Sequence, residues 1–442
     1  MKKRTYLYKI IAVALFLTAT SSCKKEFKDP NAALGTDVLN SAQGLTGVAL
    51  GLQRVYTAGR PGVLFSAIAA NGLVTNELVL LNAGNIPELQ LSTGGNAVDG
   101  TNSILANLWA NSNKIIFDAD NVIVNSAKLA DKSYAAGLIV YSSVFKALAI
   151  GNLSLYWEKI PSGIGANVSF ITRVDGFKKA IAVINNAIAV MTANPISSSF
   201  TLNLPNLPNS SPLVQAIDLT NTLYALKARY ALFAGDYATA LAAVNTVDLT
   251  KRSIFSFDSN GPNPIFLVAA SNVNVFHSTN TNLGLTGSYV PDAGDKRILF
   301  YTSVATTAPL TRINGFGASI GSSIPIYLPG EMILIKAEIL ARQTNPDLVN
   351  GLIELNKVVT KQPAADPFGV GAGLSPLVGP FTQTELLNLI YKHRSIELYM
   401  SGLKLEDMRR FGLPTTERKR NFFPYPFTER DNNPNTPADP TF

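Results

Sequence analysis

The sequence predicts a mainly α-helical protein, in which pairs of helices stack into a solenoid core and long irregular loops are inserted. Apolar residues recur at helical spacing through much of the chain. Short turn segments divide several of these helices into pairs. Two long stretches, about 59–100 and 253–323, show no sustained helical period and are predicted to be loop-rich insertions.

The composition favours a large packed core. Hydrophobic residues make up 47% of the 442 residues and charged residues only 15%, so disorder is not expected. The formal net charge of +7 overstates the basic character, because four basic residues lie in the first nine positions. Without them 33 basic residues face 30 acidic ones. Nucleic-acid binding, which needs a basic face or stripe, is therefore not expected.

The N-terminus has the layout of a bacterial secretory signal. Basic residues come first, the apolar run Ile10–Leu17 follows, and small residues precede Cys23, the only cysteine. The run is shorter than the roughly 20 residues that span a bilayer. We therefore predict that 1–22 is a lipoprotein signal peptide and that Cys23 carries the lipid anchor. An ordinary secretory signal with a stray thiol is the alternative.

The mature chain, 23–442, is predicted to be one α-helical domain. A short tether, about 24–31, precedes the helices, and the single cysteine excludes an intrachain disulfide. The predicted helical segments are 103–126, 134–153, 176–191, 219–247, 330–359 and 382–400. Thr172–Asp175 and Thr382–Glu385 have the capping pattern of helix starts. The tail 412–442 contains six prolines, which predicts no regular element there.

The helix pairs have the character of tetratricopeptide repeats. In Tyr224–Leu241, small Ala228 allows close approach of two helices and Gly235-Asp236 makes the turn. A looser counterpart runs through Ile335–Leu355. Such pairs bury their apolar faces only by stacking, which predicts a solenoid. For each pair taken alone, the alternative is an ordinary helical hairpin that is not part of a repeat.

A charged segment follows the predicted helix 382–400. Arg394 and Glu397 are three residues apart and are predicted to pair on one helix face. Asp407, Arg409 and Arg410 are expected on a short helix beyond Gly402, where the first helix stops. Glu397 and Asp407 have two interpretations, as a catalytic acid–base pair or as carboxylates that neutralise arginines and pin two helices together. We prefer the second, because no nucleophile or metal ligand accompanies them.

The same segment, Glu397–Gly412 (ELYMSGLKLEDMRRFG), resembles the C-terminal signature of the SusD/RagB family. These are nutrient-binding outer-membrane lipoproteins of Bacteroidota. Five further segments resemble family motifs in order and spacing: 108–121, 135–161, 295–297, 331–341 and 423–426. The resemblance covers essentially the whole mature chain. Gly402-Leu403-Lys404 replaces the usual Gly-His-Arg, which indicates a divergent member.

The resemblance implies a function as well as a SusD-like fold. It implies a non-catalytic lipoprotein, without cofactor or metal, anchored in the outer membrane and exposed at the cell surface. This protein would capture a nutrient, an oligosaccharide in the first place, and deliver it to a SusC-like TonB-dependent transporter. A peptide or glycoconjugate is left open as the ligand.

Candidate ligand residues are sought on the two loop-rich insertions. Sugars are bound by aromatic faces and by side chains that hydrogen-bond hydroxyl groups. From the residues of these types in the insertions we select Arg60, Phe65, Asn71, Asn76, Glu77, Phe276, His277, Tyr289, Tyr301 and Arg312. Trp109 and Trp157 lie in or at the end of apolar helices and are predicted to be core residues.

Two other functions compete with this prediction. A periplasmic helical-repeat scaffold lipoprotein would share the fold and the anchor. A secreted glycan-degrading enzyme would need two carboxylates in a cleft. The sequence has no His-Glu-x-x-His zinc signature, and its two histidines, His277 and His393, are far apart.

Overall fold

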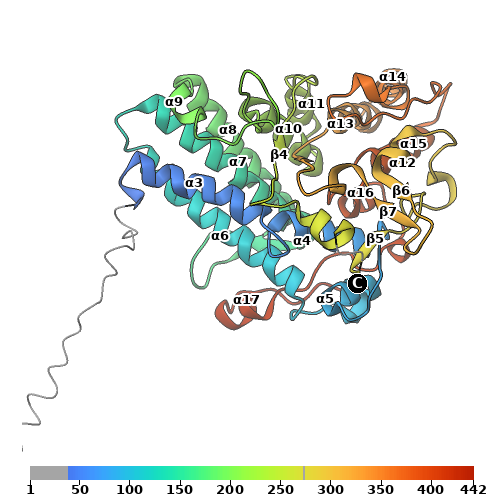
Figure 1. Ribbon diagram of the computed structural model, residues 1–442, viewed down its shortest axis with the longest axis horizontal. Coiled ribbons are helices and arrows are strands. Elements are labelled where there is room, and N and C mark those ends of the chain that lie inside the picture. The colour runs from blue at the N-terminus through green and yellow to red at the C-terminus, as the bar shows by residue number, and fades with distance from the viewer. Residues whose placement is uncertain (1–37, 272–273) are drawn as a thin grey trace, which may run out of the picture.

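The computed structural model describes residues 38–271 and 274–442 (Figure 1). The predicted signal peptide, the lipidated Cys23 and the tether lie outside these residues. The helices are α3 Ala42–Thr57, α4 Val63–Val74, α5 Ile86–Thr93, α6 Ser103–Ser126, α7 Lys132–Tyr156, α8 Arg173–Ala193, α9 Ser198–Thr201, α10 Leu219–Phe233, α11 Tyr237–Val244, α12 Lys296–Tyr301, α13 Pro329–Arg342, α14 Leu348–Val359, α15 Gln383–Glu397, α16 Lys404–Arg410 and α17 Phe427–Asn432.

Strands are few and short in the described chain. They are β1 Leu78–Leu80, β2 Lys159–Pro161, β3 Phe170–Thr172, β4 Ile254–Phe255, β5 Phe276–Ser278, β6 Thr302–Val304, β7 Thr311–Ile313 and β8 Ile324–Pro325. They form antiparallel pairs, β1 with β5, β2 with β3, β4 with β8 and β6 with β7. The mainly α prediction is confirmed.

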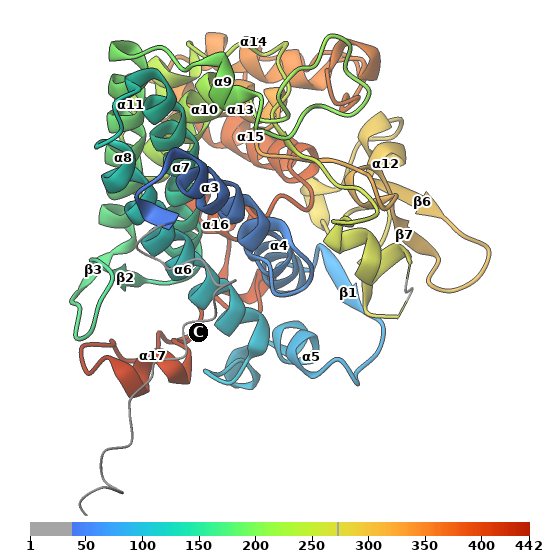
Figure 2. The ribbon, with the colours of Figure 1, turned by 60° about the vertical axis from the view of Figure 1, so that its left-hand side comes forward.

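The long helices stack side by side in a row. Contacts run from α6 to α7, α8, α10, α11, α13, α14 and α15 in turn. In Figure 1 this row curves from α6–α8 on the left, over α10 and α11, to α13–α15 on the right. The smaller elements α4, α5, α12 and β1, β5, β6 and β7 gather on one side of the row (Figure 2). The predicted solenoid core with loop-rich insertions on one side is therefore present.

The predicted helix pairs form as the motifs indicate. Gly235 adopts φ +77° between α10 and α11, a left-handed conformation that glycine adopts without penalty. Ala228 and Ala240 are fully buried where the two helices meet. Thr172 accepts a hydrogen bond from the Asp175 amide at 3.1 Å, and Thr382 completes a capping box with Glu385. Local sequence thus sets both helix starts.

One helix, α7, is long and apolar enough to cross a membrane by length and composition. In this fold 94% of its most apolar window is buried among the neighbouring helices. Trp157 at its end and Trp109 on α6 contact each other, with ring centroids 4.8 Å apart, and both are buried. The prediction that both tryptophans are core residues is confirmed.

Two predictions about irregular segments are wrong in part. The stretch 59–100 contains α4, whose twelve residues are all buried, and α5. The α4 sequence (VLFSAIAANGLV) is apolar on every face, so it has no helical period to detect.

The proline-rich tail contains α17, which begins directly after Pro426. Proline is tolerated just before or at the first turn of a helix, where its missing N–H is not needed.

The predicted Arg394–Glu397 pair is also wrong. Both side chains are fully buried, and they reach different neighbours. Arg394 donates to Asp407 at 3.1 and 3.2 Å, which pins α15 to α16. Glu397 accepts from Arg297 at 3.1 Å and from Lys361 at 2.7 Å. These contacts support the structural interpretation of the two carboxylates, because each is buried against a cation.

Candidate functional site

The two loop-rich insertions come together through a short sheet. β1 pairs with β5, so that Val79 lies opposite His277. The Thr279 hydroxyl also donates to the Asn76 carbonyl at 2.6 Å. Residues about 200 positions apart therefore lie side by side at the edge of the helical row. The two insertions, on which the candidate ligand residues were sought, therefore meet at this sheet.

An open hollow lies beside this region, between α4, α5 and the start of α6. Its volume is about 380 Å³. The lining residues are Arg60, Phe65, Gly84, Asn85, Ile86, Pro87, Glu88, Ser103, Ile104 and Asn107. Figure 2 shows α5 below α4, with the N-terminal end of α6 next to it. Two of the predicted ligand residues, Arg60 and Phe65, thus meet in one hollow.

An ion pair between Arg60 and Glu88 dominates the chemistry of this hollow. The Arg60 side chain is 45% exposed, whereas the Glu88 side chain is fully buried. The guanidinium carbon also lies 5.8 Å from the centre of the Phe65 ring. The second carboxylate oxygen of Glu88, Oε2, is buried without a hydrogen-bond partner among the described residues. A buried acceptor without a partner is costly, so a donor placed there would be stabilised.

Hydrogen bonds fix the walls of the hollow. The Asn102 amide donates to the Pro87 carbonyl at 2.9 Å and to Gln90 Oε1 at 2.8 Å, which ties α5 to the start of α6. The Asn111 amide donates to the Pro61 carbonyl at 2.7 Å, which holds the Arg60 loop against α6. The side chains of the hollow are therefore held on anchored backbone, as a preformed binding site requires.

The hollow suits an uncharged, hydroxylated ligand. Arg60 and Glu88 balance each other's charge while offering both donors and acceptors. Asn85 and Asn107 add amide groups, and Ile86, which is 57% exposed, provides an apolar face. Within residues 38–271 and 274–442, no group of three His, Cys, Asp or Glu side chains is placed to hold a metal ion.

Six of the ten predicted ligand residues are in the core. Their side chains are buried, which leaves no exposed aromatic platform or amide at these positions. They are Phe65, Asn71, Glu77, Phe276, His277 and Tyr301. Phe65 and Phe276 stack on each other with ring centroids 6.0 Å apart. Of the six, Phe65 contributes to the wall of the hollow and the other five do not line it.

Burial changes the titration of two of these residues. It raises the pKa of Glu77 to about 7, although nearby Lys404 opposes the shift. Asn71 donates to Glu77 at 2.8 Å. Burial, with the charge of Arg312, lowers the pKa of His277 to about 4. Neutral His277 accepts a hydrogen bond from the Ile313 amide at 3.2 Å, so its role here is to hold β7.

The remaining predicted residues lie elsewhere on the loop-rich side. Asn76 and Arg312 are half-buried near the β1–β5 sheet. Tyr289 is half-buried against Tyr391, with ring centroids 4.9 Å apart. Its hydroxyl donates to Asn388 at 3.3 Å, near a separate shallow hollow. The structure therefore does not bring these three residues to the Arg60 hollow.

Sequence reasoning missed the other residues that line the hollow, Glu88, Ile86, Asn85 and Asn107 among them. The sequence contained a signal for Ile86 and Glu88. Proline followed by an acidic residue, as in Pro87-Glu88, is typical of the first turn of a helix. That pattern places Glu88 on a helix near its N-terminus. It does not reveal that Arg60, 28 residues earlier, is the partner.

Comparisons with known proteins bear on the fold. No family model matches the sequence, and no curated protein matches it. Solved structures do match: a SusD superfamily protein from Bacteroides vulgatus superposes with a TM-score of 0.67 at 14% identity, over 91% of this chain and 99% of that one. The chain has the SusD fold.

Two further SusD-like structures have names that state a ligand. A SusD-like carbohydrate binding protein from Bacteroides vulgatus superposes with a TM-score of 0.60 at 14% identity, over 84% of this chain and 83% of that one. A laminarin binding SusD-like protein superposes with a TM-score of 0.55 at 12% identity, covering 91% and 99%. The predicted resemblance to the SusD/RagB family is thus confirmed at the level of the fold.

Proposed function

We propose that this protein is a non-catalytic, glycan-binding lipoprotein that captures an oligosaccharide in the Arg60 hollow. The observation that carries the proposal is the Arg60–Glu88 pair, half-exposed and with one buried carboxylate oxygen left without a partner. Sugar hydroxyls accept hydrogen bonds, so they can bond the exposed part of the Arg60 guanidinium, which the buried Glu88 carboxylate holds in place. The SusD fold supports the proposal, because two proteins that share it are named for carbohydrate or laminarin binding.

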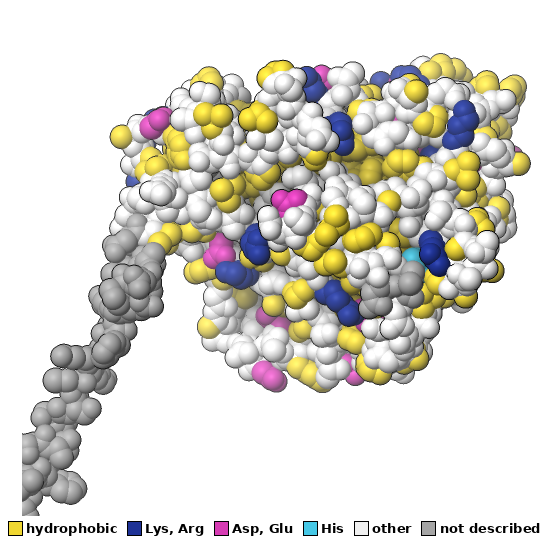
Figure 3. Space-filling model, viewed as in Figure 1, with side chains coloured by type: hydrophobic (Ala, Val, Ile, Leu, Met, Phe, Trp, Pro, Cys, Tyr) yellow, Lys and Arg dark blue, Asp and Glu magenta, His cyan; other side chains and the backbone are white. Residues whose placement is uncertain are grey.

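The surface chemistry favours a neutral ligand. Figure 3 shows a face dominated by uncharged polar and apolar atoms, with few acidic or basic side chains. A charged polysaccharide would be recognised by a cluster of one sign, as phosphate and carboxylate are recognised by arginines. At the hollow, however, Arg60 is already paired with Glu88. We therefore propose a neutral oligosaccharide.

The cellular part of the proposal rests on the leader and on the fold. We propose that Cys23 is lipidated, that the protein is anchored in the outer membrane with its binding face at the cell surface, and that it delivers the glycan to a SusC-like TonB-dependent transporter. Extraction of native outer membranes in mild detergent tests this step. A TonB-dependent barrel that copurifies in near-equal amount is expected, and elution of the protein alone would contradict it.

The scaffold and enzyme alternatives receive less support. A scaffold that binds no small ligand needs no anchored hollow with an unpaired buried acceptor, which costs folding free energy. A retaining or inverting glycosidase needs two free carboxylates about 5 to 10 Å apart. At the hollow, Glu88 is paired with Arg60 and no second carboxylate lines the wall.

Calorimetric titration with neutral oligosaccharides, beginning with laminarin fragments, tests the binding site. The Arg60→Gln variant should bind at least tenfold more weakly than the natural protein, because it loses a charge-assisted hydrogen bond to the sugar. Lys114→Gln is the matched control, since it removes a similarly exposed cation paired with Asp118 on α6, outside the hollow. Equal affinity in both variants would reject the Arg60 hollow as the site.

A further inference from the structure

A second cavity lies inside the molecule, between the helical row and the loop-rich side. Its walls come from α4, α7, α10, the β4–β8 pair and the turn 398–403 that joins α15 to α16. Its free volume is about 80 Å³. One water needs only about 10–15 Å³ of such volume, so several atoms of a small molecule fit.

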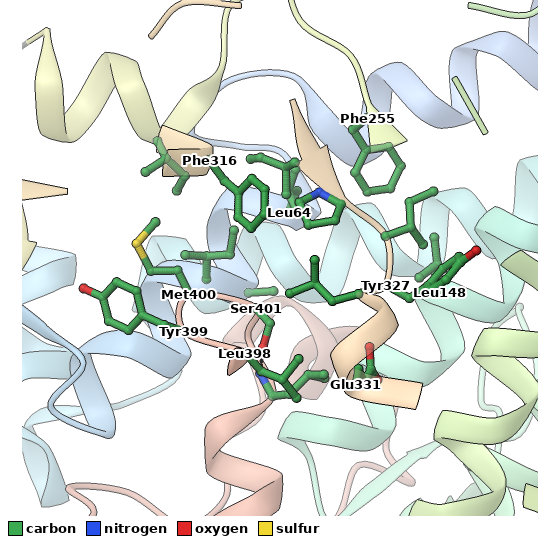
Figure 4. Close-up of a pocket in the computed structure, with 18 of the residues that line it drawn as sticks. Leu64, Leu148, Phe255, Phe316, Tyr327, Glu331, Leu398, Tyr399, Met400 and Ser401 are labelled. Atoms are coloured by element: carbon green, nitrogen blue, oxygen red, sulfur yellow. Dashed lines mark hydrogen bonds between the residues drawn. The ribbon is translucent and has the colours of Figure 1, made fainter. Parts of the chain in front are cut away.

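The walls of this cavity are mainly apolar, although tyrosines and a few polar side chains also line it. In Figure 4 the rings of Phe255 and Phe316 lie on one side and Leu398 and Ser401 on the other, with Leu64 between them. A sugar would leave its hydroxyl groups unsatisfied against such walls, at a cost of a few kcal/mol for each group. This cavity therefore does not extend the glycan site.

One ion pair provides the charged part of the wall, and Asn152, Asn314 and Ser401 add uncharged polar groups. Arg229 donates two hydrogen bonds of 2.6 Å to the Glu331 carboxylate and one of 2.9 Å to the Ile326 carbonyl. The pair is electrically balanced, so a charged ligand would bring an uncompensated buried charge. A carboxylate accepts about four hydrogen bonds, which leaves room for one donor from a ligand on Glu331.

The entrance of the cavity is held open by a fixed turn. Ser401 is exposed and Met400 half-buried, whereas the inner residues are buried. Met400 has φ +59° and Gly402 φ +81°, so two residues of the turn are left-handed. The Tyr156 hydroxyl contacts the carbonyls of Gly402 and Ala67 at 2.7 and 3.1 Å, which fastens the turn to α4. A left-handed methionine costs conformational energy and persists only where its surroundings hold it.

We propose that this cavity binds a small, neutral, apolar ring that carries one hydrogen-bond donor, of the phenol or indole class. The ring packs between Phe255, Phe316 and Leu64, and its donor reaches Glu331. Such a ligand satisfies both requirements of the walls, burial of apolar surface and one hydrogen bond to a balanced charge pair. The site is separate from the Arg60 hollow, so the proposal stands independently of glycan binding.

Ligand-observed NMR with phenol, indole and toluene tests the proposal on the folded chain. Phenol and indole should bind saturably, and toluene, which lacks the donor, should bind severalfold more weakly. Ser401→Trp, which places a large side chain at the entrance, should weaken phenol binding at least tenfold. Ser198→Trp, an exposed serine on α9 away from the cavity, is the matched control and should bind as the natural protein does.

A second variant approaches the site from the inside. Leu64→Phe fills part of the cavity and should also weaken phenol binding, and circular dichroism establishes that each variant is folded. Arg60→Gln should leave phenol binding unchanged, which separates this site from the glycan site. Absence of saturable phenol binding up to its solubility limit, or equal binding by the natural protein and Ser401→Trp, would overturn the proposal.

Discussion

Ion pairs occur in two contrasting settings in this molecule, the charged turn around α15 and α16 and the hollow beside α5. At α15 and α16 the carboxylates of Glu338, Glu397 and Asp407 are fully buried, and each contacts two or more cations. At the hollow, Glu88 contacts one cation, Arg60, which is itself half-exposed. The first setting resembles a closed structural network, and the second leaves bonding capacity for a ligand.

The pKa shifts at the closed network agree with this contrast. Burial alone would raise the pKa of Glu338, but Arg410, Arg394 and Arg342 outweigh it and lower the pKa to about 2. Burial would likewise lower the pKa of Arg297, but Asp295 and Glu397 raise it. Glu338 and Arg297 therefore stay charged through the physiological pH range. The comparison shows that Glu338, Glu397 and Asp407 each share two or more cations, whereas Glu88 has one and keeps an oxygen without a hydrogen-bond partner.

The largest expected loss of stability follows from breaking the closed network. Glu397→Gln removes the shared partner of Arg297 and Lys361 and leaves two buried cations with fewer contacts. We expect the free energy of unfolding to fall by about 3–5 kcal/mol, as when one member of a buried pair is lost. Urea denaturation measures this. Glu158→Gln, at an exposed acid, is the control, and a similar small change in both variants would contradict a structural role.

A smaller effect concerns Glu77, a buried carboxylate outside the network. Its pKa is raised to about 7 by burial, above that of the unfolded chain. The folded state then holds a proton that the unfolded state releases, so stability is greatest below about pH 4.5 and is lost as pH rises to about 7. Over that range the loss is on the order of 3 kcal/mol for a shift of this size.

The Glu77→Gln variant isolates this contribution. It cannot ionise, and its side-chain oxygen can still accept from Asn71. The difference in unfolding free energy between variant and natural protein should therefore grow in favour of the variant from pH 4.5 to pH 8. His277, whose low pKa acts in the opposite direction, is common to both proteins and cancels. Parallel stability profiles across this range would show that Glu77 ionises normally.

The smallest expected effect on stability is at the hollow. Arg60→Gln should lower the free energy of unfolding by about 2 kcal/mol, because buried Glu88 loses its cation but the glutamine amide can still donate a hydrogen bond to it. Thermal denaturation measures this. The main expected effect of Arg60→Gln is the loss of glycan affinity, not the loss of stability. A loss of stability as large as that of Glu397→Gln would remove the distinction between the two settings.

Local sequence determined the solenoid. Helical periodicity, the capping residues Thr172 and Thr382, and the Gly235 turn act over a few residues each, so α8, α10, α11 and α15 are readable without tertiary information. Residues 397–412, which resemble the SusD/RagB signature, also predicted the fold that the solved structures confirm. The helix α4 was missed, because a segment that is apolar on all faces carries no periodic signal.

Only the tertiary structure decided which polar residues are buried and which are available. Asn71, Glu77 and His277 have the same composition signal as Arg60, yet packing places them in the core. Glu88 lines the hollow because α5 folds against α6 and meets the Arg60 loop, a contact that no short sequence window contains. Helices are specified by neighbours along the chain, whereas a binding hollow is specified by neighbours in space, and those are set only when the helices pack.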